Sequence, residues 1–444
     1  MRLSRRGFIG TTALSGGAAL LPAELLARTT ASAPPPVDLR DWDAVRRLFE
    51  LSPDYVHAAL FLLSSHPRPV REAVDEMRRA LDANPADVLE EGAFGPPEHN
   101  LDLRATAAVA RYIGASADDV ALVNSTTHGL AVAYQGLSLG PGDEILNTAH
   151  DHVVHLETVR LVSERCGASA RQVRLFEGHD ASAATTDPLV RTLRNAISPA
   201  TRVLGVTWVH SSSGLKLPIR PLAEALREVN EHREPGRRVT LLVDGVHGLG
   251  ADDPRVAETG IDVFVSGLHK WMLAPRGTGI VWARPELWAR MRPINFSYNA
   301  EDLYVAWIEG RPPRPPARAS WFGLGGFQAY EHIWAIPAAV EMHEAMGPAR
   351  VKERILTLNG TVREELSKMP HVRLRTPRDP ELSAGITAFE VEGLSPHEVV
   401  KKLRTHRVIA SVSPYRPTYA RLSFGIANSE ADVDRAVAAV RALR

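Results

Sequence analysis

The chain has 444 residues, of which 44% are hydrophobic and 23% charged, so it has the length and apolar content for a buried core and for two or more domains. Its 52 lysines and arginines balance its 52 aspartates and glutamates, which argues against nucleic acid or an anionic membrane surface as a partner. The single cysteine, Cys166, excludes an internal disulfide and a metal site built from cysteines.

Residues 1–33 have the layout of an export signal, with a basic start, an apolar run and small residues at the end. The apolar run is too short and too weakly hydrophobic to predict stable membrane insertion. The string SRRGFIG, with Arg5, Arg6 and Phe8, resembles a twin-arginine signal, which predicts that the twin-arginine machinery exports the folded chain to the periplasm or the exterior. Cleavage is expected after Ala33 or Ala31. The alternative is an amphipathic N-terminal helix of a cytoplasmic protein.

Strands and helices are predicted to alternate after an N-terminal segment at 34–65. Helical periodicity predicts helices at 70–84, at 103–114 with Gly114 as its C-cap, at 187–197 and at 221–233. Apolar runs predict buried strands at 119–124, 143–148, 171–177, 202–209, 238–244 and 261–266. This alternation predicts an α/β fold, a mostly parallel sheet with helices on both faces, whose ligand lies at the carboxyl ends of the strands.

The pattern changes after residue 310. The Pro- and Arg-rich stretch at 310–320 is interpreted as a solvated connector. A long helical stretch at 335–369 follows, and then strands and a last helix at 429–443. We therefore expect a large domain at 66–320 and a smaller α/β domain at 330–444.

Polar residues follow the predicted strands. Ser125, Thr126 and Thr127 open a helix after the first strand, and hydroxyls with free N–H groups at a helix start suit a phosphate, although a plain N-cap is the alternative. After the second strand come three histidines, at 150, 152 and 155. Their loose spacing argues against a metal, and either an imidazole stacked on an aromatic ligand or a plain polar loop fits them better.

Asp244 and Lys270 each follow a buried strand. A buried carboxylate needs a partner, either a cationic ring nitrogen or an arginine. Lys270 lies between two apolar stretches, where burial lowers the pKa of an amine and makes it reactive, although a solvated turn is the alternative. The small residues HSSSG at 210–214 end another strand. An anion site, a buried acid and a reactive lysine together fit pyridoxal 5′-phosphate (PLP).

From about residue 60 onward the chain resembles the class V aminotransferase-fold PLP enzymes, the group of the cysteine desulfurases and isopenicillin-N-epimerase-like proteins. The matching strings are STTHG, HDH, VDGVHGLG, SGLHKWMLAPRGTG and ARLSFGIANSEADVD. The resemblance implies that Lys270 forms the internal aldimine and moves the Cα proton, that Asp244 pairs with the pyridine nitrogen, and that His152 stacks on the ring. These three residues are the expected catalytic residues.

The resemblance also implies binding roles. The residues expected to hold the phosphate are Thr126, Thr127, Ser266 and His269. Ser211 and His247 are placed near the ring hydroxyl. Arg421 is expected to bind the substrate α-carboxylate as a bidentate clamp, the alternative being a surface strand arginine. The family also implies a homodimer.

The sequence departs from the family in two places. The late stretch VIASVSPYRPTYARLS lacks the nucleophilic cysteine of desulfurases, and Cys166 lies far upstream. Gly326 and Phe327 stand where the family often has a Gly-Thr pair that reaches the neighbouring subunit's phosphate. We expect chemistry at the Cα of an amino acid, of the aminotransferase class V or epimerase-like kind, with transamination, racemisation and elimination all open. The resemblance to isopenicillin-N-epimerase-like proteins favours amino-acid chemistry on a non-protein substrate. The alternatives are a C–S or β-elimination lyase, and an exported ligand-binding protein without turnover.

Overall fold

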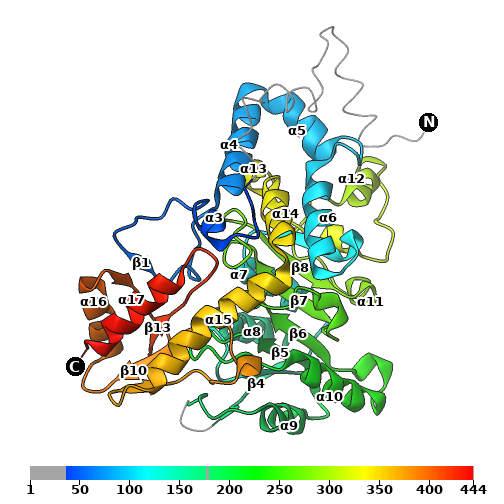
Figure 1. The fold of residues 1–444 in the computed structure, drawn as a ribbon. Helices are drawn as coiled ribbons and strands as arrows, with labels where there is room; N and C mark the ends of the chain where they lie inside the picture. The colour runs from blue at the N-terminus through cyan, green and yellow to red at the C-terminus, as the bar shows by residue number, and fades with distance from the viewer. Residues whose placement is uncertain (1–36, 177–179, 444) are drawn as a thin grey trace.

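The fold is described from a computed structural model, which places residues 37–176 and 180–443; the predicted export signal lies outside them. A seven-stranded sheet forms the centre (Figure 1), in the order β2-β8-β7-β6-β5-β3-β4. The bounds of its strands are Val120–Val123 (β2), Glu144–Thr148 (β3), Ser169–Val173 (β4), Thr201–Thr207 (β5), Thr240–Asp244 (β6), Val263–Gly267 (β7) and Gly279–Ala283 (β8). The predicted parallel α/β sheet is confirmed for β3 to β7, which pair in parallel.

Strand β8 is the one that the sequence reading does not predict. It pairs antiparallel with both β7 and β2. Because β7 and β8 form a hairpin, no helix separates them, and the connection at 268–278 stays at the carboxyl edge of the sheet. Strand β4 is also shifted: it covers Ser169–Val173 rather than 171–177, and as an edge strand it is mostly exposed.

Helices cover both faces of this sheet. The bounds on and around it are Arg68–Ala83 (α4), Pro85–Phe94 (α5), Leu101–Ile113 (α6), Thr126–Gly136 (α7), Val153–Cys166 (α8), Thr186–Ala196 (α9) and Ile219–Glu231 (α10). Gly114 ends α6 in the left-handed region at φ 71°, as predicted. Alternate strand residues serve opposite faces: Leu204 packs in the core under α6, α9 and α10, whereas Val203 packs in the core under α7 and α8.

The C-terminal part is built on a separate four-stranded antiparallel sheet, in the order β12-β13-β10-β9. Its strands are Val372–Leu374 (β9), Thr387–Val391 (β10), Ser411–Val412 (β12) and Ala420–Leu422 (β13), and its helices are Pro348–Ser367 (α15), Pro396–Thr405 (α16) and Glu430–Arg441 (α17). The N-terminal segment joins this part, because β1 (Val56–His57) pairs in parallel with β11 (Val408–Ile409).

The predicted helix at 335–369 is two helices, because Gly347 breaks it with φ 84°. The first, α14 (Ile336–Met346), packs on α4 and α6, and the short α13 (Tyr330–Ile333) packs on α4. The division into domains stays a prediction, but this packing favours a small domain that starts near Pro348 rather than at residue 330. The other short helices are Trp42–Arg46 (α3), Pro285–Trp288 (α11) and Glu301–Ile308 (α12).

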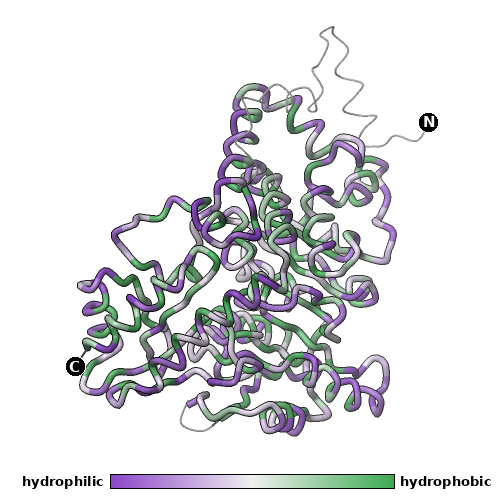
Figure 2. Tube along the Cα trace, in the orientation of Figure 1, coloured by the Kyte–Doolittle hydropathy of each residue, from purple (hydrophilic) through white to green (hydrophobic). Residues whose placement is uncertain are grey.

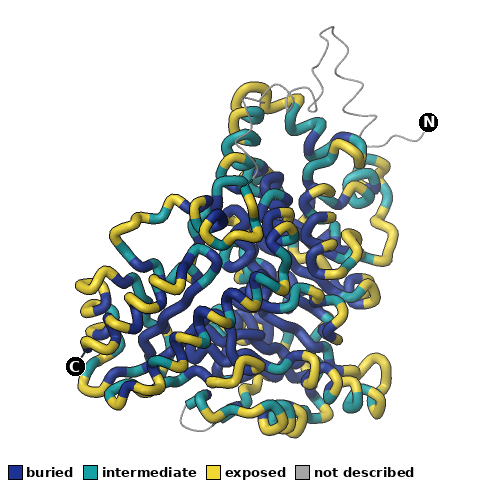
Figure 3. The backbone as a smooth tube through the Cα atoms, in the orientation of Figure 1, coloured by how far each residue is buried: buried dark blue, intermediate teal, exposed yellow. Residues whose placement is uncertain are grey.

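Burial follows this architecture. Figure 3 shows the strands of the large sheet in the buried centre and exposed residues on the outer helices. Figure 2 shows hydrophobic residues running through the same centre, with hydrophilic turns on the outside. Among the residues that the structure places, no helix has the length and apolar character to cross a membrane.

Candidate functional site

The carboxyl ends of β6 and β7 bring the two central predicted residues together. Asp244 is the last residue of β6, and it lies in register with Val265 of β7. Lys270 follows β7 by three residues, in the loop that returns to β8. Because neighbouring parallel strands end at the same edge, both side chains reach one site.

Lys270 is half-buried, and its Nζ lies 3.2 Å from Nε2 of His247. The pKa of Lys270 is lowered to about 8, chiefly by burial; the Asp244 charge opposes this shift and the Arg421 charge adds to it. The hydroxyl of Ser64 donates to the carbonyl oxygens of His269 (3.0 Å) and Lys270, which fixes the loop. The alternative of a solvated turn is wrong, because loop residues on both sides of Lys270 are buried, namely Leu268, Met272 and Ala274.

Asp244 is buried, and its Oδ1 accepts the Val246 N–H at 3.1 Å. Burial raises the pKa of this carboxyl, whereas the neighbouring His155, Lys270 and His152 lower it. Asp244 forms no ion pair with an arginine or any other cation in the described part of the chain. A buried acid without a paired cation is suited to a cationic group of a ligand.

The N-terminus of α7 faces the end of β7. Oγ1 of Thr126 accepts the Gly267 N–H at 2.8 Å, and Thr127 is exposed in the first turn of the helix. The hydroxyl of Ser266 is fully buried and donates to the Gly267 carbonyl at 2.9 Å. Nδ1 of His269 is buried and has no hydrogen-bond partner among the residues placed.

Gly267 lets the side chains of His269 and Thr126 approach the backbone closely in this corner. A Cβ at residue 267 would lie 2.8 Å from Cε1 of His269 and 3.1 Å from Oγ1 of Thr126. Ser125 serves as the N-cap, since its hydroxyl accepts the His128 N–H at 3.1 Å, so the capping alternative holds for Ser125. The first N–H groups of α7 and the unpartnered imidazole form a cradle for an anion.

His152 and Ser211 meet at a residue that sequence reasoning missed. The ring of Tyr415 packs edge-on against His152, with 5.7 Å between centroids and 75° between planes. Its Oη lies 2.7 Å from Oγ of Ser211, and burial raises its pKa. Tyr415 comes from the small sheet, in the stretch where a desulfurase cysteine was sought; a hydroxyl-bearing aromatic in that loop is the signal that could have found it.

Arg421 lies on β13 and is 1% exposed, so the alternative of a surface arginine is wrong. Its guanidinium donates only to neutral oxygens: the hydroxyl of Ser411 (3.2 Å) and the carbonyls of Ser211 (2.6 Å) and Val412 (2.9 Å). It forms no ion pair with any carboxylate in the described ranges. Burial lowers its pKa to about 10.

A second missed residue, Phe61, joins Arg421 to His247. The guanidinium of Arg421 lies over the ring of Phe61, 4.9 Å from the centroid, and the ring of His247 lies 5.6 Å away. Nδ1 of His247 accepts the indole N–H of Trp271 at 3.3 Å, and burial holds the pKa of His247 well below its usual range. His247 is therefore a neutral neighbour of the Lys270 amine at neutral pH.

The other two histidines that follow β3, His150 in the turn and His155 in the first turn of α8, have partners of their own. Nε2 of His155 lies 2.6 Å from Oη of Tyr134. Nε2 of His150 accepts the Leu175 N–H at 3.2 Å, and its ring stacks on Phe176 with centroids 4.0 Å apart. Only His152 of this group faces Tyr415 at the site.

These side chains fit PLP. The α7 cradle with its unpartnered imidazole suits a phosphate, the buried acid suits a protonated ring nitrogen, and the lysine has an amine with a lowered pKa. The profile of the family described as aminotransferase class-V matches residues 67–436. The chain belongs to the aminotransferase class-V family.

The chain is also similar in sequence to isopenicillin N epimerases and cysteine desulfurases. Isopenicillin N epimerase of Streptomyces clavuligerus is 28% identical over 414 residues, which is 91% of this chain and 98% of that protein. A probable cysteine desulfurase of Methanothermobacter thermautotrophicus is 24% identical over 373 residues, 81% of this chain and 84% of that protein.

Solved structures share the fold. A C-DES mutant with glycine covalently linked to its PLP cofactor has a TM-score of 0.77, 18% identity, and covers 89% of this chain and 99% of its own. The apo cysteine desulfurase of Thermococcus onnurineus has a TM-score of 0.75, 20% identity, and covers 90% and 97%. The cofactor of this class V chain is pyridoxal 5′-phosphate.

Two family-specific expectations concern residues outside the site centre. Phe327 is 71% exposed, and its ring lies 5.9 Å from that of Tyr298. Whether the backbone at Gly326 and Phe327 reaches a neighbouring subunit's phosphate stays a prediction. Cys166 is the last residue of α8 and packs, partly buried, against the core under that helix.

Proposed function

We propose that this class V protein is a PLP-dependent enzyme that acts at the Cα of an amino acid, with an epimerase-like reaction as the first candidate. The observation that carries the proposal is Arg421. Its buried guanidinium donates hydrogen bonds only to neutral oxygens. It is close enough to Lys270 for its charge to lower the pKa of that amine. A buried cation without a counter-ion calls for an anion, and an amino acid brings a carboxylate to it.

The cofactor would be held by the residues described at the strand ends. Thr126, Thr127, Ser266 and His269 would hold the phosphate with the N-terminus of α7. Asp244 would accept from the ring nitrogen, His152 would cover a ring face, and Ser211 and His247 would lie near the ring hydroxyl. When bound through the lysine amine, PLP withdraws electrons from the substrate Cα, which makes the Cα–H bond more acidic.

The protein's own groups would then place the substrate and move the proton. Arg421 would orient the carboxylate with two parallel hydrogen bonds. The amine of Lys270, with its pKa near 8, would take the Cα proton and return it. His247, whose pKa is held low, would stay neutral beside that amine and would not compete as a cation. Tyr415 and Phe61 would exclude water from the side of the small sheet.

The epimerase-like reaction is supported by the relative from Streptomyces clavuligerus, which matches over 98% of its length. The test is to incubate the purified holoenzyme with candidate amino acids in deuterated water, with and without pyruvate. Deuterium at Cα with inversion and no keto acid would support an epimerase. Keto acid that requires pyruvate would indicate a transaminase, and no exchange with any amino acid would favour a ligand-binding protein without turnover.

A C–S lyase is the second candidate, because cysteine desulfurases are among the relatives. A persulfide route is disfavoured, since the loop between β12 and β13 holds Tyr415 and no cysteine. We expect that Cys166→Ser leaves turnover nearly intact, because this thiol packs on α8 away from the site. A loss above about tenfold in kcat/KM, about 1.4 kcal/mol, in a folded variant would contradict this.

Export and assembly are proposed with the activity. Twin-arginine export rests on Arg5 and Arg6, and changing both to lysine should retain the protein in the cytoplasm; unchanged localisation would count against it.

A homodimer is supported by exposed apolar side chains near residue 327, with Ile294 41%, Phe296 44% and Phe327 71% exposed.

A further inference from the structure

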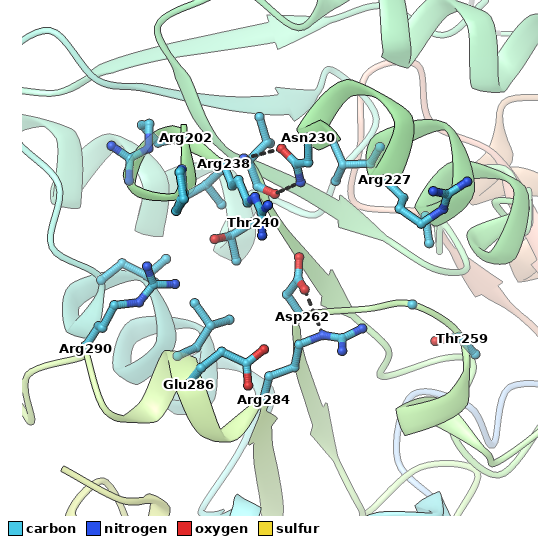
Figure 4. Close-up of a pocket in the computed structure, with 18 of the residues that line it drawn as sticks. Arg202, Arg227, Asn230, Arg238, Thr240, Thr259, Asp262, Arg284, Glu286 and Arg290 are labelled. Carbon is cyan, nitrogen blue, oxygen red and sulfur yellow. Dashed lines mark hydrogen bonds and ion pairs between the residues drawn. The ribbon is translucent and has the colours of Figure 1, made fainter. Parts of the chain in front are cut away.

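A cavity of about 970 Å³ lies at the amino edge of the large sheet, away from the proposed PLP site (Figure 4). Its walls come from α10, the start of β6, the turn before β7 and the region of α11. Thr240 in its wall and Asp244 in the PLP site are the first and last residues of β6, which are about 13 Å apart in a strand. The cavity is therefore a separate site.

Some of the arginines that line the cavity are already neutralised. Arg227 pairs with Glu224 at 2.7 Å and with Glu231. Arg284 pairs with Asp262 at 2.9 Å, as the dashed line in Figure 4 marks. The carboxylates of Glu224, Glu231 and Asp262 therefore already have arginine partners.

Three other lining arginines lack such neutralisation: Arg202, Arg238 and Arg290 (Figure 4). Within the described residues, the side chains of Arg238 and Arg290 form no ion pair or hydrogen bond. Arg202 lies 3.5 Å from Asp143, but that carboxylate is shared with Arg237, which is closer at 2.7 Å.

Arg202 gives the strongest evidence. Its side chain is only 20% exposed, and its Nε is buried without a partner among the residues placed. Burial lowers its pKa, Asp143 opposes this, and the charges of Arg237 and Arg290 lower it further. Of the lining acids, only Glu286 forms no ion pair with a described residue, so one unpaired carboxylate lines the cavity together with these three arginines.

We propose that this cavity binds a small polyanion that carries phosphate groups, such as a diphosphate or the phosphate chain of a nucleotide. Guanidinium groups match phosphate oxygens with forked hydrogen bonds, and several of them together select for more than one negative charge. The hydroxyl of Thr240 lies in the same wall and adds a neutral donor. The proposal is independent of the reaction at the PLP site.

Calorimetric titration of the PLP-loaded protein with inorganic pyrophosphate tests the proposal, because bound PLP keeps the probe out of the cofactor site. We expect saturable binding that weakens with added salt. The double variant Arg238→Gln/Arg290→Gln should weaken it at least about tenfold, the loss expected for charge-assisted hydrogen bonds. Both side chains are exposed, so the variant should keep its melting temperature and PLP absorbance.

Arg227→Gln is the matched control, since Arg227 lines the same cavity but is held by two glutamates. It should change the affinity less than about twofold. Titrations with ATP and adenosine separate the sources: binding of ATP but not of adenosine identifies the phosphate chain as the recognised part. Absence of binding at millimolar pyrophosphate, or an equal loss in Arg227→Gln and in the double variant, would overturn the proposal.

Discussion

Lys270 and Arg421 are two basic side chains in one partly buried site, and the charge of Arg421 acts on Lys270. The charge of Arg421 contributes to the low pKa of Lys270, and burial lowers the pKa of both. Asp244 opposes the effect on Lys270 but is buried itself. A site with this balance has a larger fraction of neutral lysine amine than an ordinary lysine, and it favours an anionic ligand at the arginine.

The capture of PLP by the cofactor-free protein should therefore depend on pH. The pKa of Lys270 is lowered from 10.5 to about 8, so the reactive neutral amine appears as pH rises through 8. We expect the capture rate at pH 7 to be about a tenth of its plateau value, which is reached above about pH 9. Stopped-flow absorbance measures this rate. Arg421→Met should move the profile to higher pH, whereas a wild-type rate still rising past pH 10 would indicate an ordinary lysine.

Substitution of Arg421 should separate charge from geometry. Arg421→Lys keeps a charge but loses the parallel hydrogen bonds, so PLP absorbance should be unchanged while KM rises and kcat falls. Arg421→Ala should cost about 2–4 kcal/mol in kcat/KM. With wild-type protein, a substrate that lacks the carboxylate should show a similar loss in kcat/KM. Combining that substrate with Arg421→Ala should lower kcat/KM little further. Wild-type turnover by Arg421→Ala would make Arg421 structural and would remove the support for an amino-acid substrate.

At the scale of elements, the large sheet packs so closely against α7 and α8 that residue 205 of β5 must be glycine. Gly205 of β5 faces Tyr134 of α7 and His155 of α8, which are hydrogen-bonded to each other at 2.6 Å. Asn147 of β3 donates to the Gly205 carbonyl at 3.1 Å. This contact sets how α7 and α8 lie on the sheet, and the start of each helix supplies residues to the site.

Gly205→Ala should destabilise the fold strongly. A Cβ at residue 205 would lie 1.8 Å from Oη of Tyr134, so the helix or the strand must shift. We expect a loss of about 3 kcal/mol or more in the free energy of unfolding, at the upper end for overpacking. Gly140→Ala is the control, because its Cβ would have no neighbour within 4 Å. Equal chemical-denaturation midpoints for the two variants would contradict this packing argument.

At the scale of the whole molecule, three parts of the chain build the site. The large sheet supplies Lys270 and Asp244, the small sheet supplies Arg421, and the N-terminal segment, paired to the small sheet through β1, supplies Phe61 and Ser64. A movement between the two sheets would therefore change the substrate end of the site more than the cofactor end.

The proposed dimer is testable at this scale. Phe327→Asp would place a charge in the exposed aromatic cluster with Tyr298, and we expect it to raise the dimer dissociation constant by about tenfold or more. Sedimentation velocity at several concentrations measures this. Trp307→Asp is the control, an exposed aromatic (75%) on α12. A monomeric wild type, or equal effects of both substitutions, would count against a dimer through this surface.

Local sequence patterns predicted most of the large sheet and much of the candidate site. Apolar runs located most strands to within a few residues, because a strand buried on both faces needs a continuous apolar pattern. The strand-end rule then placed Asp244 and Lys270 at one edge without any knowledge of contacts. Strand β8 was missed although all five of its residues are buried, because no helix separates it from β7 and the expected alternation of strands and helices breaks there. The exposed edge strand β4 was shifted because it lacks a buried pattern.

Tertiary structure alone decided which distant side chains complete the site. Tyr415 meets Ser211 across 204 residues, and Ser64 meets Lys270 across 206. Such contacts leave no periodicity in the sequence, since they arise where two sheets pack rather than within one element. The sequence by itself determined that this chain places a lysine and an acid at the end of a buried sheet. Only the packing of the small sheet decided that Arg421 is buried there without a carboxylate partner, because burial and pairing depend on neighbours that are remote in the chain.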